Sequence, residues 1–501
     1  MHLRFAFSKV RWHPAVGGVR GAQMLDVGTT IARKRGKMGP LSGCRFVIES
    51  FHNPIRFSER IYQRFGPIAE FDMPTLRRHR PRKHLFIVGP DHNREVLRNT
   101  DAIRPSGLWS LDGPPGSALH AIQHHYSFKT YGQTHSQIVQ VVNRPLRRSR
   151  VEGHFERTKE IVQSEIAKWP RSRTIDLYHE VRLLAQRVSF ALLFGENDVA
   201  RIRKLGELAF RYNRGNWNPF SYLFPVKAMG TPYHRTWQAA ETLRSYIRDW
   251  IAEASVRSPD DDIVAAFAHV NDGKDNPLPA ENIFGGMVFY TVASYESISS
   301  MTTWALLLLV LHPGVMGQLL DELSMVPKVD DIDHQGLSGL RFLDAVVKEV
   351  LRLIPPTAVA QFRVFERCEI SSRTLFASDR IVLAPHMTHR LPEIYYAPMR
   401  FHPERWFTIS PSQYEYLPFM AGARRCPGSW FGTDFLKVAL AAILFRYRIK
   451  LNPGTRLDWR FAGTTIPRGP VPVQLVEQDR LVQSQSVTGS IFDLFERPAS
   501  T

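Results

Sequence analysis

The pattern of apolar and polar positions along the chain predicts a mainly helical protein with a minor β-sheet region. Helix-like periodicity, with apolar residues at every third or fourth position, dominates residues 155–354 and returns over residues 429–446. Short strand-like runs occur near residues 84–89, 359–384 and 470–476. No Gly/Ser-rich linker, repeat or low-complexity tract divides these segments, so we expect one large domain.

Two segments carry clear signals for where a helix ends. Residues 281–311 are rich in Met, Phe, Val, Ala and Leu and stop at His312-Pro313. Residues 342–354 are amphipathic and stop at Pro355-Pro356. Because proline lacks the backbone N–H that continues a helix, each site marks a helix C-terminus. The second half of the chain therefore holds a long apolar helix and a shorter amphipathic one.

A single cysteine stands in the turn before a third, amphipathic run, residues 431–445. The turn, residues 419–428, reads Phe-Met-Ala-Gly-Ala-Arg-Arg-Cys-Pro-Gly, and we expect Pro427 at the first position of the following helix. A nearby cation and a helix N-terminus both lower a thiol pKa, so the sequence predicts a stabilised thiolate at Cys426. Such a thiolate is either a nucleophile or a metal ligand.

The surroundings favour a metal ligand over a nucleophile. A nucleophile needs a general base, and no histidine lies between His402 and the C-terminus. A zinc site needs further ligands at close spacing, whereas Cys44 and Cys368 are far away in the sequence. A single thiolate suits heme iron, whose other positions are already filled by the porphyrin.

The turn also matches a known motif. Phe419, Gly422, Arg424, Cys426 and Gly428 occupy every fixed position of FxxGxRxCxG, the heme-binding motif of the cytochrome P-450 family, which the chain resembles. The resemblance implies heme b (iron protoporphyrin IX) with the cysteine as axial iron ligand. We expect the arginine to reach a propionate, the phenylalanine to shield the sulfur from water, and both glycines to let the backbone pass close to the macrocycle.

A second motif lies in the amphipathic helix. Glu349 and Arg352 share one helical face, although most such pairs are solvated surface contacts. They match the ExxR motif of the family, in which the pair is buried and joined by an arginine from a downstream Pro-Glu-Arg loop. Arg405 occupies that place in this chain. The resemblance implies a structural role for the three residues on the heme side of the core.

The long apolar helix contains a polar segment at residues 293–297. Ala-Ser-Tyr-Glu-Ser resembles the oxygen-activation segment of the family, (A/G)-G-x-(D/E)-T, with Ser294 in place of glycine and Ser297 in place of threonine. An acid beside an alcohol can deliver protons to bound dioxygen, which assigns that role to Glu296 and Ser297. Serine is freer in rotamer than threonine, so we expect looser coupling of oxygen use to product, and Ser294 to narrow the groove for dioxygen. An ordinary polar notch in a core helix is the alternative.

Two further residues resemble heme contacts. Arg363 fits the family's arginine that meets a propionate along the heme edge, with an exposed strand arginine as the alternative. His135, in Gly132-x-x-His, fits the family's Gly-x-x-His before a helix, but Val139 stands where the family has arginine. A capping or surface role is the alternative for His135.

A separate group, His120, His124 and His125, offers two imidazoles at metal-like spacing, but no third ligand is evident in the sequence.

The composition adds a strong positive charge. The chain has 65 Lys and Arg against 47 Asp and Glu, a formal net charge of +18. The cations are spread along the chain without a nucleic-acid-binding motif, so we expect no nucleic-acid partner. A basic face around Arg424 and Arg425 would steer an acidic electron donor, either a ferredoxin or a flavoprotein reductase. A merely solvated basic surface is the alternative.

The chain divides into three parts by composition. We expect a basic N-terminal extension over residues 1–40, in which Asp26 is the only acid, a cytochrome P-450-like domain over 41–480, and a polar, loosely held C-terminal tail over 481–501. No stretch reaches the ~20 apolar residues of a membrane span. Three cysteines argue against a disulfide framework. We expect a monomer in the cytoplasm, with mitochondrial import of a transit-like N-terminus as the alternative.

The family resemblance implies a heme-thiolate monooxygenase. Such an enzyme inserts one oxygen atom from O2 into a C–H bond of a hydrophobic small molecule, using electrons from a separate donor. Two alternatives remain open: a heme-thiolate enzyme that does not use O2, either peroxide-driven or isomerising, and a non-catalytic heme-binding protein. The sequence does not identify the substrate.

Overall fold

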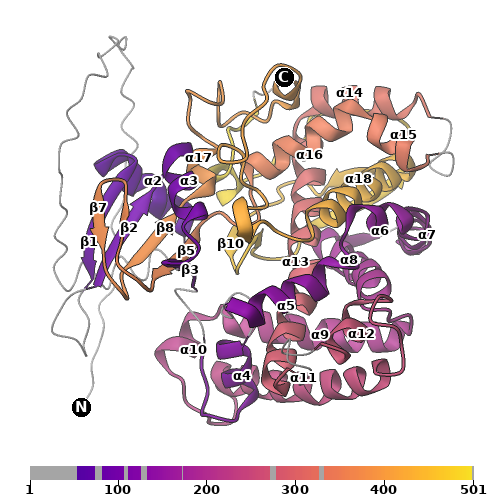
Figure 1. Cartoon of the computed structure of the whole chain (residues 1–501). Helices are drawn as coiled ribbons and strands as arrows, with labels where there is room; N and C mark the ends of the chain where they lie inside the picture. The colour runs from indigo at the N-terminus through magenta and orange to yellow at the C-terminus, as the bar shows by residue number, and fades with distance from the viewer. Residues whose placement is uncertain are drawn as a thin grey trace, which may run out of the picture. The chain divides into compact units, whose positions relative to one another are not determined.

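The structure is a computed structural model of the chain, and it describes residues 53–73, 82–106, 111–125, 132–171, 173–270, 278–326 and 332–498 (Figure 1). All of these belong to one compact unit, Arg35–Thr501. The N-terminal extension expected over residues 1–40 and Cys44 lie outside the described residues.

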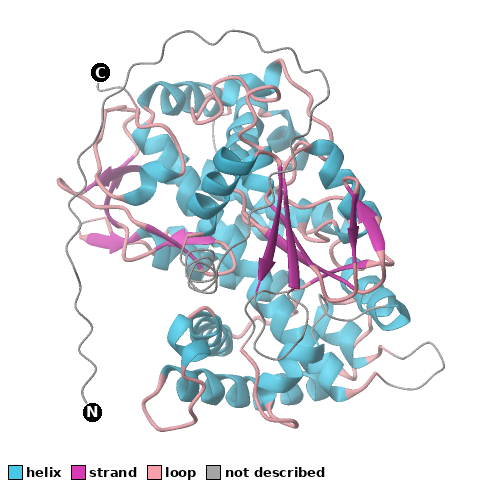
Figure 2. Cartoon of the chain, turned by 90° about the vertical axis from the view of Figure 1, so that its left-hand side faces the viewer, coloured by secondary structure: helices cyan, strands magenta, loops and turns pink. Residues whose placement is uncertain are grey.

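Helices form most of the described chain and strands form small sheets among them (Figure 2). The α-helices are α2 Pro54–Phe65, α3 Pro90–Arg98, α4 Ala118–His125, α5 Gly132–Asn143, α6 Arg148–Gly153, α7 Phe155–Ile166, α8 Leu177–Leu193, α9 Val199–Asn216, α10 Pro219–Leu223, α11 Pro232–Ala254, α12 Ile263–Ala268, α13 Ala280–Leu311, α14 Pro313–Leu323, α15 His334–Gly339, α16 Arg341–Leu353, α17 Pro385–Thr388 and α18 Ser429–Arg446. Short 3₁₀ turns are η2 Pro403–Phe407, η3 Gly422–Arg424 and η4 Ser490–Asp493.

The strands form one five-stranded sheet and three smaller ones. They are β1 Ile68–Met73, β2 Arg82–Ile87, β3 Ile103–Pro105, β4 Thr174–Asp176, β5 Ala360–Val364, β6 Cys368–Ile370, β7 Arg373–Leu375, β8 Arg380–Leu383, β9 Tyr447–Leu451, β10 Trp459–Phe461, β11 Thr465–Pro467 and β12 Pro472–Glu477. The largest sheet has the order β1-β2-β8-β5-β3, and its only parallel pair is β2 with β8. The expected mainly α fold with a minor sheet is confirmed.

Helix α13 is the central element of the helical core. It begins after Pro279 and ends at Leu311, before His312-Pro313, as the sequence predicts. Every residue from 298 to 311 is buried, and α8, α14, α16 and α18 all pack against this helix. Its hydroxyl groups bond back to carbonyls one turn earlier, and Trp304 Nε1 donates to the carbonyl of Thr465 at 2.7 Å. The helix therefore provides a rigid frame for the polar segment at its middle.

Helix α18 differs from its expected character. The sequence suggests an amphipathic helix, but 13 of its 18 residues are buried, including Lys437, whose Nζ lies 2.6 Å from Asp344 of α16. Its N-cap is Gly428 and its first residue is Ser429, so the expectation that Pro427 opens the helix is wrong. The buried helix anchors the end of the cysteine turn.

The C-terminal residues pack more tightly than the expected tail over 481–501. Ile491, Leu494 and Phe495 are fully buried in the main core, and the carbonyl of Leu494 accepts a hydrogen bond from Arg390 at 2.9 Å. The many polar residues around these three apolar side chains concealed the contact in the sequence.

Among the described helices, none alone is long and apolar enough to cross a bilayer. Only α13 taken together with α14 meets that standard of length and composition, and the two helices are bent by 109° where they meet.

Candidate functional site

The cysteine turn, residues 419–428, contains η3, leads directly into α18 and is closed by its own backbone. The N–H of Cys426 donates to the carbonyl of Phe419 at 2.8 Å. Gly422 has φ +66°, and a Cβ there would lie 2.9 Å from the carbonyl oxygen of Leu97, so the approach of α3 requires glycine. At Gly428 a Cβ would make only ordinary contact, 3.8 Å from the cysteine sulfur. Passage of residue 428 close to a macrocycle therefore stays a prediction.

The electrostatics of Cys426 differ from the sequence expectation. Burial raises the pKa of its thiol, and the opposing effects of the Gly428 N–H and of Arg425 are too small to reverse that direction. The side chain nevertheless keeps accessible surface. A metal ion bound at the sulfur would supply the stabilisation of the thiolate that the protein alone does not.

Helix α13 crosses α18 close to this turn. A Cβ on Gly432 would lie 3.5 Å from Ile298 of α13 and 3.9 Å from the Phe419 ring. Ser297 is therefore adjacent to the crossing point. Ala293, one turn earlier, is exposed although it lies in the middle of a core helix, and Ser297 is half-buried. The oxygen-activation segment and the cysteine turn are thus neighbours.

Arg424 and His135 come from distant parts of the chain and meet. Arg424 Nη1 donates to Nε2 of His135 at 2.7 Å, and both side chains are half-buried. The contact brings η3 and the first turn of α5 together. A guanidinium and an imidazole side by side provide donors for one anionic group, which is the arrangement a propionate needs.

Arg363 lies in the five-stranded sheet. On β5 it is paired in register with Arg104 of β3 and Arg380 of β8, so three cations are adjacent across the sheet. Its Nη2 is 3.4 Å from Ser378 Oγ, and its guanidinium lies over the Phe365 ring at 5.2 Å. These contacts hold the side chain on the sheet, and its role toward a propionate stays a prediction.

Glu349, Arg352 and Arg405 form a buried ion-pair triad. Arg352 donates to both carboxylate oxygens of Glu349, at 2.8 and 2.9 Å, and Arg405 Nε donates to Oε1 at 3.0 Å. The backbone N–H of His402 and Nε1 of Trp406 each add a donor at 3.0 Å. Arg352 uses its remaining donors on the carbonyls of residues 389, 398 and 400.

The triad is electrostatically satisfied despite complete burial. Burial alone raises the pKa of Glu349, but the charges of Arg352 and Arg405 outweigh it and hold the pKa below its ordinary value. The carboxylate therefore stays ionised at neutral pH. Because the triad joins α16 to η2 and to the loop before η2, it fixes the polypeptide that leads to the cysteine turn.

Glu296 is buried in a different environment. Its Oε1 accepts a hydrogen bond from the hydroxyl of Tyr178 on α8 at 3.0 Å, while its Oε2 has no partner among the described residues. Burial raises the pKa of Glu296, and the Tyr178 hydroxyl and the more distant Arg182 and Arg460 offset it only in part. The group is therefore biased toward its protonated form, which is able to donate a proton.

The two serines of the segment have different partners. Ser294 Oγ donates to the carbonyl of Thr291 at 3.1 Å, and α13 continues as a regular helix through this position. The Ser297 hydroxyl has no hydrogen-bond partner within the described ranges. Ser297 can thus donate to or accept from a bound molecule, whereas Ser294 is satisfied by its own helix.

Together these residues fit a heme. Cys426 keeps accessible surface, a cation and an imidazole stand nearby, and accessible helix surface at Ala293 and Ser297 lies on the neighbouring helix α13. A separate cavity of about 220 Å³, lined by Trp304 and by residues 456–458 and 467–471, contains none of these groups.

Sequence reasoning missed Tyr178, because no spacing or motif links it to a glutamate 118 positions away.

Comparison with known proteins also indicates a heme-binding protein. The family model for cytochrome P-450 matches residues 34–476. Cytochrome P-450 139 of Mycobacterium tuberculosis is 26% identical over 384 residues, which cover 74% of this chain and 86% of that protein. Cyclooctatin synthase of Streptomyces melanosporofaciens is 27% identical over 329 residues, covering 62% of this chain and 69% of that protein.

A solved structure has the same fold. The retinoic acid-bound cyanobacterial CYP120A1 superposes with a TM-score of 0.73, covering 86% of this chain and 96% of that chain. At 20% identity this likeness concerns the fold alone.

Proposed function

Because the chain belongs to the cytochrome P-450 family, we propose that it inserts one oxygen atom from O2 into a C–H bond of a hydrophobic small molecule. Membership makes it a heme-binding oxidoreductase of the heme-thiolate monooxygenase type. The proposal adds heme b, O2 as the oxidant and a separate electron donor. A bound thiolate-ligated heme supplies cleavage of the O–O bond, favoured by electron donation from sulfur.

The observation that carries the proposal is the place of Cys426. The residue keeps accessible surface in a turn held by the backbone bond to Phe419, and the turn lies next to the α13–α18 crossing. We assign Cys426 as the iron ligand, and Arg424 with His135 as partners of a propionate. Arg363 is a further propionate candidate.

Residues of α13 would move the protons that oxygen chemistry needs. Glu296 is biased toward its protonated form by burial, and Ser297 has a free hydroxyl one residue further along the helix. We assign Glu296 as the group that holds the proton and Ser297 as the group nearest the reacting oxygen. Tyr178 positions the glutamate through its hydrogen bond.

An acidic electron donor suits the exposed cations beside α18. Arg148 lies over the exposed ring of Trp430 at 4.9 Å, which places the N-terminus of α6 next to that of α18. Arg147, Arg150 and Arg425 are also exposed. Arg424, in contrast, is engaged with His135. We therefore propose a docking face formed by these exposed arginines, for a ferredoxin or a flavoprotein reductase.

The substrate class and cellular setting are proposed at a coarser level. The compared cyanobacterial structure is bound to retinoic acid, a largely apolar molecule, which supports a hydrophobic substrate. We also propose a cytoplasmic monomer; the bacterial origin of the two relatives described above supports the cytoplasmic setting only.

A carbon-monoxide difference spectrum of the reduced protein tests the assignment of the iron ligand. We expect the red-shifted Soret band typical of thiolate-ligated heme, and its loss in Cys426→Ser. Cys368→Ser is the matched control, because Cys368 is a half-buried cysteine on β6 outside the site, and it should keep the band. Retention of the band in Cys426→Ser would overturn the assignment.

Dependence on an electron donor separates the alternative functions. We expect product only when O2, a reductase system and a substrate that shifts the Soret band are all present. Full-rate product formation without a donor would favour a peroxide-driven or isomerising enzyme. Reducible heme with no product from a broad panel of Soret-shifting ligands would favour a non-catalytic heme protein.

A further inference from the structure

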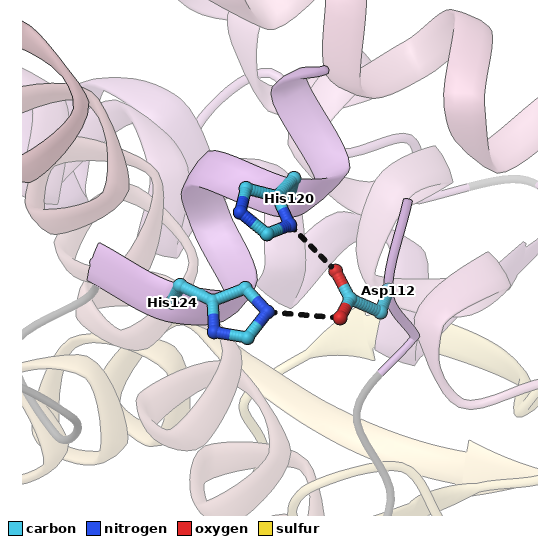
Figure 3. A group of neighbouring side chains, drawn as sticks. All are labelled: Asp112, His120 and His124. Carbon is cyan, nitrogen blue, oxygen red and sulfur yellow. Dashed lines mark hydrogen bonds and ion pairs between the residues drawn. The ribbon is translucent and has the colours of Figure 1, made fainter. Parts of the chain in front are cut away.

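Three side chains of the kinds that can bind a metal ion gather at α4 and the loop before it (Figure 3). His120 and His124 lie one turn apart on this helix, and both point to Asp112 on the preceding loop. His120 Nδ1 is 3.3 Å from Oδ1 of the aspartate, and His124 Nε2 is 2.8 Å from Oδ2. The three candidate ligand atoms all lie within 4.8 Å of one another. The aspartate supplies the third ligand that the sequence did not reveal.

We propose that Asp112, His120 and His124 bind a divalent transition-metal ion, for which Zn²⁺ is the best match. Two imidazoles and one carboxylate are a ligand set of open zinc sites, in which water completes the tetrahedron. With Zn–N and Zn–O bonds of about 2.0–2.2 Å, ligand atoms stand roughly 3.3 Å apart. Side-chain rotation of these partly exposed groups brings the atoms to that separation without movement of the backbone.

The backbone around the aspartate is already fixed. The Tyr233 hydroxyl on α11 donates to the carbonyl of Asp112 at 3.0 Å, and the Gly113 N–H donates to Oδ1 at 2.8 Å. Pro114 and Pro115 follow and restrict the loop. A Cβ at Gly113 would lie 2.5 Å from Ser117 Oγ and 3.1 Å from Leu119 Cβ, so a larger residue would force Ser117 to shift. Such supporting contacts orient a metal ligand in advance.

Helix α4 is held in place by contacts at its N-terminus. Ser117 Oγ accepts a hydrogen bond from the N–H of His120 at 3.2 Å, and the N–H of Ala118 donates to Glu241 of α11 at 2.9 Å.

Metal binding would act on the position of α4. This helix packs against α13, which carries Ala293, Glu296 and Ser297, and against α11. An ion shared by residue 112 and α4 ties the loop to the helix and restrains both. The inference does not rest on the proposed monooxygenase activity, because the site contains none of the residues assigned to it.

Equilibrium dialysis of the full-length, heme-loaded protein against chelator-buffered Zn²⁺ tests the site. We expect stoichiometric binding, and weaker binding in Asp112→Asn, His120→Ala and His124→Ala. Changes in supporting residues alone cost metal sites about 10–100-fold in affinity, so loss of a ligand should cost at least about tenfold. His125→Ala is the matched control, since His125 is the next residue on α4 but lies outside the cluster, and it should bind as the wild type does.

A second measurement needs no variant. Zn²⁺ should protect His120 and His124, but not His125, from diethyl pyrocarbonate, with modification measured by mass spectrometry. Equal affinity in all the variants, or absence of stoichiometric binding by a protein with an intact carbon-monoxide spectrum, would overturn the proposal and leave a hydrogen-bonded cluster only.

Discussion

Two glutamates near the centre of this protein are equally buried but electrostatically opposite. Glu349 is fully buried and Glu296 is 4% exposed. The first receives donors from Arg352, Arg405 and two further groups, and its pKa is lowered. The second receives one phenolic donor from Tyr178, and its pKa is raised. Burial acts in the same direction on both, so the number and charge of their partners determine the difference.

The comparison separates structural from chemical carboxylates. A buried carboxylate surrounded by cations stays ionised and ties elements together, but it has no proton to give. A buried carboxylate with one neutral partner retains a proton at a higher pH and keeps an oxygen free for another contact. This difference supports a structural role for the triad and a proton-transfer role for the segment on α13.

Breaking the triad should have the largest effect. Glu349→Gln leaves the buried charges of Arg352 and Arg405 without their counter-ion, which costs about 3–5 kcal/mol of unfolding free energy. We expect loss of heme retention and of the folded state under mild denaturant, measured by circular dichroism and Soret absorbance. The difference in unfolding free energy between Glu349→Gln and the wild type should shrink in acid. The lowered pKa of Glu349 stabilises the protein above the ordinary value of 4.5, and this stabilisation is lost as pH falls through the folded value.

An exposed ion pair is the matched control for this variant. Arg148 and Glu152 lie 2.7 Å apart on α6, with both side chains exposed to solvent. Glu152→Gln should change the unfolding free energy by no more than about 0.5 kcal/mol. A loss in Glu349→Gln no larger than in this control would remove the structural interpretation of the triad.

Neutralising the other glutamate should affect catalysis and leave folding intact. Glu296→Gln keeps the shape and removes the transferable proton. We expect turnover to fall by about 10²-fold or more, the usual contribution of a positioned acid, with an unchanged carbon-monoxide spectrum. The measurements are the turnover rate and the product formed per electron consumed. Wild-type values of both in this variant would exclude Glu296 as the proton donor.

The contribution of Glu296 to stability should change with pH in the opposite direction to that of Glu349. With a raised pKa, the folded protein keeps a proton that the unfolded chain releases above about 4.5, so this contribution falls as pH rises toward the folded value. Glu296→Gln lacks this pH-dependent contribution, because glutamine does not titrate. Its stability relative to wild type should therefore increase with pH over that window in denaturant titrations.

Removing the phenolic partner should have an intermediate effect. Tyr178→Phe deletes a hydrogen bond of about 1 kcal/mol, equivalent to roughly fivefold in rate. This hydrogen bond lowers the pKa of Glu296, so its loss should move the alkaline limb of the activity–pH profile to higher pH, by less than about one unit. Tyr447→Phe is the matched control, because its buried hydroxyl bonds the carbonyl of Ile166, and it should leave the profile in place.

Local chain patterns predicted the elements that carry the site. Continuous apolar periodicity with Pro313 after α13, and with Pro355-Pro356 after α16, gave the ends of both helices within a residue or two. The motif residues Glu349 and Arg352 could be anticipated to face each other, because three positions along a helix make one face. Such features depend only on neighbours in sequence.

The rest depends on contacts that sequence spacing does not encode. Tyr178 reaches Glu296 from another helix, and Asp112 reaches His120 across a Gly-Pro-Pro-Gly turn. The direction of the Cys426 pKa was wrong because burial, which a sequence does not reveal, outweighs the local cation and N–H groups. Each difference comes from tertiary packing, which brings together residues that are far apart in the sequence or buries a residue that the sequence singles out.

The smallest effect should come from the hydroxyl beside Glu296. Ser297→Thr keeps the hydroxyl and adds a methyl group that restricts χ1, which lowers the rotamer entropy lost on binding by about 0.5 kcal/mol. We expect about a twofold rise in product per electron, with unchanged stability and spectra. Ser294→Thr, whose hydroxyl bonds the carbonyl of Thr291, is the control and should not raise coupling. An equal or lower yield in Ser297→Thr would show that rotamer freedom at this position does not limit proton delivery, and the difference between the two glutamates would then be the main determinant.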